Sequence, residues 1–287
     1  MNAPHSRASG LPVDRPSSSS LLLVGTGLIG GSFALAARAQ GLFDRVIGTD
    51  SNPEALSTAC SLGIVERPET SIEPTGVCIA TPVSQIAEQV ADAAMRYPGV
   101  PIFDVGSVKT MVVDSLRNDG AVPPHFVPCH PIAGSEKVGA RAARADLFRG
   151  RSVIITPVEE TDPETVATVE SWWRRIGAIV ASHDPGAHDR IIAATSHLPH
   201  LVAFALMEVL EGLDEKAIEA YIGDGFRDLS RVAASDPTIW SDILQANRDA
   251  TLGLAKQLGT RLVIDDNKAA LRRRLAKARD LRVRLDG

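Results

Sequence analysis

Four segments of this 287-residue chain carry residue types that can move a proton or hold an anion. A neutral histidine can accept a proton near pH 7. Arginine can hold a carboxylate through two parallel hydrogen bonds, so the arginines of the last segment would suit an anionic substrate. The segments read DVGSVK (104–109), HPIAGSE (130–136), SHLPH (196–200) and GFRDLSR (225–231), and the last is followed by SDPTIW (235–240).

Each of these segments also has a purely structural interpretation. Ser107 follows a predicted strand and could cap the next helix, which is a common use of serine. His130 follows an apolar strand and could be a core histidine whose hydrogen bonds are satisfied. The segment 225–240 could be a solvated loop with a helix cap at Asp236. Taken one at a time, the segments leave both interpretations open.

The SHLPH segment lies inside a predicted helix. Ser196 and His200 are four residues apart and His197 and His200 are three apart, so all three can share one helix face. Pro199 removes a backbone donor and should kink the helix there. Two histidines at this spacing could bind zinc, but no HExxH sequence or second pair of ligands accompanies them. We therefore expect no metal.

Short apolar runs alternate with helical patterns from Leu21 to about Val180. Unbroken apolar runs of this length are typical of strands buried on both faces, as in a parallel sheet. The alternation predicts an α/β fold with a Rossmann-type, doubly wound, mostly parallel sheet. The expected strands are LLLV (21–24), RVIGT (45–49), VCIAT (77–81), PIFDV (101–105), HFVPC (125–129), SVIIT (152–156) and AIVAS (178–182).

The sequence GTGLIG follows the first predicted strand directly and opens a helix. Its glycines permit a tight turn and a close approach of the backbone to a pyrophosphate, whose charge would lie at the helix N-terminus. Asp50 ends the second strand, where an acidic residue accepts hydrogen bonds from ribose hydroxyls, and no Arg follows it to pair a 2′-phosphate. We therefore expect NAD. The candidate cofactor residues are Gly25, Gly27, Leu28, Ile29, Gly30, Asp50, Thr81 and Pro82.

Strand patterns stop near Asp184, and the rest of the chain is helix-like. The predicted parts are a disordered tail (1–20), an NAD-binding domain (21–184) and an all-helical C-terminal domain (185–287). The apolar stripes of about 100 helical residues exceed what a small bundle buries alone, so we expect the C-terminal domain to form a homodimer. We expect no third, regulatory domain.

The composition argues against several functional classes. The formal net charge of −5 argues against a general nucleic-acid or membrane-surface binder. We find no apolar run approaching the roughly 20 residues of a membrane-spanning helix and no secretory signal. Three widely spaced cysteines indicate a reduced, cytoplasmic setting. The basic run 272–284 is interpreted as a solvated helix face.

Together these segments resemble the prephenate dehydrogenase family, including its broader cyclohexadienyl dehydrogenase members. GTGLIGGS, DVGSVK, HPIAGSE, TSHLPH and GFRDLSR with SDPTIW match the family pattern in order, and the resemblance extends from Leu21 to at least Arg248. It implies a Rossmann-type domain followed by a helical domain through which two chains dimerise. It also implies NAD-dependent oxidative decarboxylation of prephenate to 4-hydroxyphenylpyruvate, on the route to tyrosine.

The resemblance also implies roles for the site residues. His130 matches the residue that accepts the proton of the 4-hydroxyl of prephenate, and Ser107 matches a serine that hydrogen-bonds that histidine and the hydroxyl. Arg231 matches an arginine that binds a substrate carboxylate, and His200 a histidine near the side-chain carboxylate. The other family pocket positions, with less defined roles, are Ser196, His197, Glu136 and Trp240.

Three other functions stay open on the sequence. Arogenate, which has an amine where prephenate has a keto group, could also be used, although His200 favours prephenate because some arogenate-preferring relatives lack it. A 3-hydroxyacid dehydrogenase would share the two-domain layout, but its catalytic lysine motif is missing here. A redox sensor that binds NAD without turnover would not need His130, Ser107 and Arg231 together.

Overall fold

Two apolar cores lie on the two faces of a parallel five-stranded sheet, as the sequence predicts. The computed structural model describes residues 19–68, 73–134 and 137–286. Successive side chains of a strand point to opposite faces, so Leu21 and Leu23 pack in one core and Leu22 in the other. The sheet has the order β2-β1-β3-β4-β5, with β1 (Ser20–Val24), β2 (Arg45–Thr49), β3 (Gly76–Ile79), β4 (Ile102–Asp104) and β5 (Phe126–Val127).

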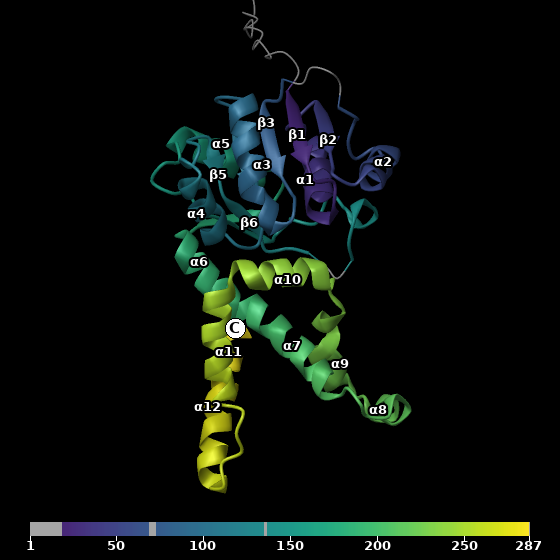
Figure 1. Ribbon diagram of the computed structural model, residues 1–287, viewed down its shortest axis with the longest axis vertical. Helices are drawn as coiled ribbons and strands as arrows, with labels where there is room; N and C mark the ends of the chain where they lie inside the picture. The colour runs from purple at the N-terminus through teal and green to yellow at the C-terminus, as the bar shows by residue number, and fades with distance from the viewer. Residues whose placement is uncertain (1–18, 69–72, 135–136, 287) are drawn as a thin grey trace, which may run out of the picture.

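Helices cover both faces of this sheet (Figure 1). On one face Phe33 and Trp173 pack edge to face, with ring centroids 4.9 Å apart. On the other face Ile86 and Val112 are fully buried. The helices of this region are α1 (Leu28–Ala39), α2 (Pro53–Ser61), α3 (Val83–Arg96), α4 (Thr110–Asn118) and α5 (Pro163–Arg175).

The predicted strand 125–129 divides at Pro128 into β5 and β6 (Cys129–Pro131). A proline cannot donate a hydrogen bond to a neighbouring strand, so the chain leaves the first sheet there. β6 instead pairs antiparallel with β7 (Ser152–Ile155), which pairs parallel with β8 (Ile179–Ser182). The last predicted strands thus form a second, three-stranded sheet, and His130 lies on it.

The N-terminal boundary differs slightly from the prediction. Ser20 was expected in the tail but is buried at the start of β1. Its backbone N–H donates to Thr75 Oγ1 at 3.1 Å and its hydroxyl donates to the carbonyl of Glu73 at 2.9 Å. These bonds attach the residue to the sheet. Residues 1–18 of the predicted tail lie outside the described residues.

Beyond β8 the described chain is helical, and Figure 1 shows these helices on one side of the sheet region. Asp184 caps the first of them, because its carboxylate accepts the backbone N–H of Ala187 at 2.8 Å. A division of domains near Asp184 stays a prediction. The helices are α6 (Pro185–Ile192), α7 (Leu198–Val209), α8 (Glu215–Tyr221), α9 (Asp224–Ser230), α10 (Pro237–Ala246), α11 (Arg248–Gly259) and α12 (Lys268–Asp286).

α6 and α7 form one continuous helical run through a π-helical turn, Ala193–His197. Pro199 lies inside this run, at the second residue of α7, where it removes one backbone donor from the helix. The helix therefore accommodates this proline with a π turn immediately before it, a feature that is frequent at functional sites. The turn carries Ser196 and His197.

This run, Pro185–Val209, is long and apolar enough to cross a membrane by length and composition, with a mean hydropathy of 1.3. Polar residues divide its apolar segments, so the sequence alone shows no continuous apolar run here. Length and composition do not distinguish a spanning helix from the central helix of a protein domain. Its polar side chains His188, Asp189 and His197 are buried and hydrogen-bonded to other protein groups, as in a domain interior.

Candidate active site

The glycine loop between β1 and α1 leaves an open space at the N-terminus of a helix. Gly25 has φ +94°, and a Cβ there would lie 2.4 Å from the carbonyl oxygen of Ala80. A Cβ on Gly30 would lie 2.5 Å from the carbonyl oxygen of Gly25, so both positions require glycine. A Cβ on Gly27 would meet nothing within 4 Å. A pyrophosphate could therefore approach Gly27, with the helix N-terminus favouring its charge. Leu28 and Ile29 follow as the first residues of α1.

Asp50 is fixed beside this loop. Its Oδ2 accepts the backbone N–H and the hydroxyl of Thr26, both at 2.8 Å, and its Oδ1 accepts the N–H of Asn52 at 2.9 Å. At the end of the neighbouring β3, the Thr81 hydroxyl is buried and has no hydrogen-bond partner among the described residues, and Pro82 caps α3. Strand order reverses between β1 and β3, which is where α/β sheets bind ligands. These groups fit a dinucleotide.

A second space, of about 590 Å³, lies where β6 meets the helical region. It brings together candidate residues that are far apart in the sequence. Glu136 lies outside the described residues. The lining includes seven of the candidates, Ser107, His130, Ser196, His197, His200, Arg231 and Trp240.

Hydrogen bonds determine which nitrogen of His130 is free. His130 Nδ1 lies 2.9 Å from His188 Nε2, and His188 Nδ1 lies 2.7 Å from Asp189 Oδ1. A carboxylate only accepts, so His188 Nδ1 carries the proton that it donates. With His188 neutral, its Nε2 accepts from His130 Nδ1, which leaves His130 Nε2 unprotonated. The network thus selects the tautomer that a base facing the cavity needs.

Asp189 is positioned by the backbone of the DVGSVK segment. Its two carboxylate oxygens accept the N–H groups of Lys109 and Thr110 at 3.0 and 2.8 Å. Burial alone would raise the pKa of Asp189, but the hydrogen bonds from His188 and from these backbone groups outweigh it and lower the pKa. Asp189 therefore stays ionised. Neither His188 nor Asp189 is among the residues predicted from the sequence, because neither belongs to one of the motifs there.

Lys109 is fully buried and paired with Asp104. Its Nζ also donates to the carbonyl oxygen of Cys129 at 2.8 Å, and Asp104 accepts the N–H of Cys129 at 3.0 Å. These bonds attach the end of β4 to β6 next to His130. The lysine of DVGSVK therefore acts as a structural connection between two strands.

The Ser107 hydroxyl is buried and has no hydrogen-bond partner among the described residues. It does not cap α4, whose N-cap residue is Lys109. The hydrogen bond to His130 implied by the resemblance is also not formed here, and His130 instead bonds His188 through Nδ1. An unpaired buried hydroxyl is costly, and a ligand hydroxyl in the cavity would satisfy it.

The two histidines of SHLPH present different hydrogen-bonding groups. Asn247 Nδ2 is a donor 3.1 Å from His197 Nδ1, so neutral His197 carries its proton on Nε2, which is buried and unpaired among the described residues. His200 Nδ1 donates to the carbonyl of Ser196 at 2.9 Å. The His200 ring stacks on Trp240 with centroids 3.5 Å apart. His197 thus offers a donor, and His200 keeps Nε2 for a ligand.

Burial keeps these histidines neutral near pH 7. Burial, followed by the neighbouring His188, Lys109 and His197, lowers the pKa of His130 well below its usual value. Burial also lowers the pKa of His197 to about 4. The pKa of His200 is lowered by burial and by the positive charge of Arg231. The cavity therefore contains neutral histidines, together with the guanidinium groups of Arg144, Arg151 and Arg231.

Comparison with known sequences identifies the family. Residues 33–182 match the family described as prephenate dehydrogenase, nucleotide-binding domain. Residues 184–263 match its companion, described as prephenate dehydrogenase, dimerization domain. The chain belongs to the prephenate dehydrogenase family.

Relatives in the prephenate dehydrogenase family cover most of the chain. The prephenate dehydrogenase of Bacillus subtilis is 36% identical over 244 residues, which are 81% of this chain and 65% of the relative, slightly under two thirds. The cyclohexadienyl dehydrogenase of Zymomonas mobilis is 34% identical, over 81% of this chain and 82% of that protein.

Solved structures show the same fold. Prephenate dehydrogenase from Aquifex aeolicus, in complex with hydroxyphenyl propionate and NAD+, has a TM-score of 0.84 and 33% identity, covering 94% of this chain and 99% of that one. Synechocystis arogenate dehydrogenase has a TM-score of 0.76 and 26% identity, covering 93% and 99%. The predicted Rossmann-type fold with a helical C-terminal region is confirmed.

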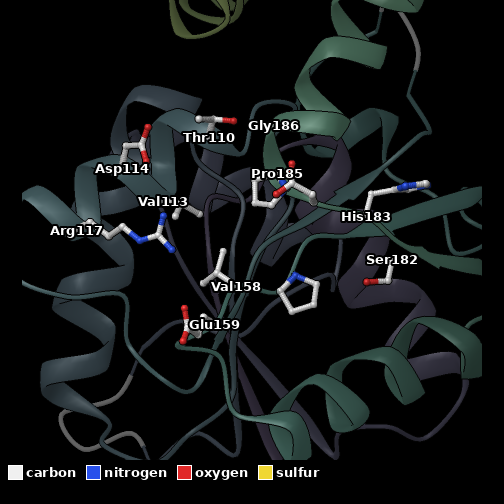
Figure 2. A pocket seen from close by; sticks show the side chains of 12 residues that line it. Thr110, Val113, Asp114, Arg117, Val158, Glu159, Ser182, His183, Pro185 and Gly186 are labelled. Atoms are coloured by element: carbon white, nitrogen blue, oxygen red, sulfur yellow. The ribbon is translucent and has the colours of Figure 1, made fainter.

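A separate cavity of about 620 Å³ lies near the start of α6 in this prephenate dehydrogenase family member (Figure 2). Its charged lining includes Asp114, Arg117 and Glu159. Arg117 is already paired with Glu160 through two hydrogen bonds of 2.9 and 3.0 Å. None of the candidate residues from the sequence lines it. Elsewhere among the described residues, no group of three His, Cys, Asp or Glu side chains gathers as a metal site would.

Proposed function

We propose that this chain catalyses the NAD-dependent oxidative decarboxylation of prephenate to 4-hydroxyphenylpyruvate, a step towards tyrosine. The observation that carries the proposal is the cavity that gathers Ser107, His130 and Arg231, with the unprotonated nitrogen of His130 left for the substrate. The family membership and the NAD+ complex of the Aquifex relative support it.

The proposed chemistry begins at the 4-hydroxyl of prephenate. His130 Nε2 accepts the hydroxyl proton as C4 becomes a carbonyl carbon, and the Ser107 hydroxyl donates to the same oxygen. NAD, when bound, accepts the hydride from C4. The bond between C1 and its carboxylate then breaks, carbon dioxide leaves, and the bonding electrons complete the aromatic ring. The C4 oxygen takes back the proton from His130 and becomes the hydroxyl of the product. The protein mainly has to hold the dianion in the right pose.

The other cavity residues would bind the substrate. Arg231 is proposed to hold one carboxylate, and the Nε2–H of His197 is proposed to donate to a polar group of the substrate. His200, whose Nδ1 donates to Ser196, presents Nε2 as an acceptor. Trp240 would fix His200 by stacking. Ser196 orients the same ring through its carbonyl oxygen. Glu136 remains a proposed pocket residue from the resemblance alone.

Arogenate is the second candidate substrate. Relatives named cyclohexadienyl dehydrogenase and arogenate dehydrogenase favour it, while His200 favours prephenate. NADH formation by the purified protein, measured with prephenate and with arogenate, each with NAD and with NADP, tests the proposal. Activity with neither acid would contradict it and leave the NAD-binding sensor as the explanation.

The proposed cofactor site predicts a strong preference for NAD over NADP. At close range Asp50 would repel a 2′-phosphate by roughly 1–4 kcal/mol. We therefore expect kcat/KM to be at least about 10-fold higher with NAD, and Asp50→Ser to narrow that ratio. Asp119→Ser, on the exposed end of α4, is the control and should leave the ratio unchanged. Equal efficiency of the wild-type protein with both cofactors would refute the assignment.

Asp189 and His188 are proposed as positioning residues for His130. Asp189→Asn removes the carboxylate that makes His188 Nδ1 a donor, so the tautomer of His130 is no longer selected. We expect kcat to fall about 10-fold or more with little change in KM. The acid limb of the pH profile should move to lower pH, because a negative charge that favours protonation is lost. A stability loss with an unchanged pH profile would show a purely structural role.

The remaining proposals concern the setting of the enzyme. The helical region 185–287 is proposed to form a homodimer, since its matching family is described as a dimerization domain, and residues 21–184 to bind NAD. The three cysteines are free thiols, which supports a reducing, cytoplasmic location. We propose no nucleic-acid or membrane partner.

A further inference from the structure

Two helices of the C-terminal region have no substantial partner within the chain. No residue of α8 is buried, and α12 is exposed or only partly buried where it is described. Among the described elements, neither helix packs extensively against another. A seven-residue helix such as α8 is marginal in water by itself. Figure 1 places α8 and α12 apart from each other, at the two outer edges of the helical region.

α12 has an apolar stripe with positive charge beside it, and Arg274 and Arg282 lie on the same side of the helix as the stripe. Leu271, Leu275, Ala278, Leu281 and Leu285 recur every three or four residues, so they share one face. Leu275 is 58% exposed and Leu285 75% exposed. The helix contains eight Lys or Arg residues and two Asp residues. Such a stripe calls for an apolar partner with a negative rim, and α12 lies beyond residue 263, where the match to the dimerization domain ends.

The region around α8 has the complementary character. An apolar groove of about 440 Å³ lies between the end of α7 and the start of α9, lined by Leu210, Leu213, Ile218, Tyr221 and Phe226. Tyr221 is 90% exposed. The segment 210–226 contains five Asp or Glu residues and one Lys. The groove thus has the negative rim that α12 requires.

We propose that α12 of one copy of this chain docks in the α8 groove of a second copy. Because the two helices lie apart within one chain, a single molecule cannot form the contact with itself. Two copies related by a two-fold axis would form it twice, each α12 on the partner's α8. The proposal rests on the homodimer proposed above, and it modifies the interpretation of the basic run, since only the face away from the leucines would be solvated.

Charge reversal tests this docking. Arg272→Glu with Lys277→Glu reverses charge at the two edges of the leucine stripe, and Glu211→Lys with Glu219→Lys reverses it beside the groove. Each pair of changes should raise the dimer dissociation constant by about 10-fold or more, because both symmetric contacts lose most of their charge attraction. Arg273→Glu alone, near the face of α12 opposite the leucines, is the control for Lys277→Glu alone and should change the constant little. Sedimentation velocity over a concentration series measures it.

Mixing the two reversed proteins provides the decisive result. In the mixed dimer one contact keeps its wild-type charges, and in the other the reversed residues of α12 and of the α8 region again have opposite signs. The heterodimer should therefore be more stable than either variant homodimer. Two results would overturn the docking but not the dimer. One is a wild-type dimer of about twice 30.4 kDa whose dissociation constant the reversals do not change. The other is a loss of the dimer that mixing the two variants does not restore. A monomeric wild-type protein would overturn both. Turnover of prephenate is measured separately, so a failure of the proposed reaction is not confused with a failure of docking.

Discussion

Replacing His130 with asparagine is expected to lower kcat for prephenate by about 100-fold or more, with little change in KM. The base acts only as the hydroxyl proton leaves, so its loss affects the transition state rather than binding. Asparagine can still hydrogen-bond the hydroxyl. Steady-state kinetics with saturating NAD measure both constants. His183→Asn, an exposed histidine outside the candidate cavity, is the control and should retain normal turnover.

The pH profile gives a second measure of the same base. His130 must be neutral to accept a proton, and burial lowers its pKa below the usual value. Activity should therefore persist at pH 7 and fall only as pH decreases through that lowered pKa. This acid limb should disappear in His130→Asn. If the variant keeps near-normal turnover or an unchanged limb, the base is another residue, and His197 would be the first to examine.

Arg231→Ala should chiefly raise KM for prephenate. The guanidinium would hold a carboxylate that is already present before the reaction, so binding weakens more than the chemical step. Loss of a charge-assisted contact costs about 2–5 kcal/mol, and the exposure of Arg231 favours the lower end, about 2–3 kcal/mol. KM should rise about 30- to 150-fold while kcat changes little.

Arg227→Ala is the matched control for this change. Arg227 belongs to the same segment and is exposed, but it does not line the cavity. Its KM should stay within about twofold of the wild-type value. Equal effects of the two variants, or a fall in kcat without a rise in KM for Arg231→Ala, would contradict the assignment of Arg231 as the carboxylate-binding residue.

The elements of the sheet region could be predicted because local chemistry determines them. Unbroken apolar runs such as Leu21–Leu23 can only be buried on both faces, and they form β1. The prediction of one continuous strand over 125–129 is wrong, because Pro128 divides it into two strands. A proline ends pairing in one sheet, but which sheet the chain joins next depends on distant residues, here Ser152–Ile155.

The sequence alone predicts the residue types of the candidate site and a glycine turn after the first strand, and the folded chain supplies the steric reason for two of the glycines. Gly25 and Gly30 are required by close approach of the backbone, and Asp50 ends a strand beside them. The tertiary structure decided that Ser107, His130 and Arg231 share one cavity. It also decided which nitrogen of His130 is free, through His188, which is 58 residues away in the sequence. Periodicity and motifs report local preference, whereas a tautomer depends on which donor lies within hydrogen-bond distance after the chain has folded.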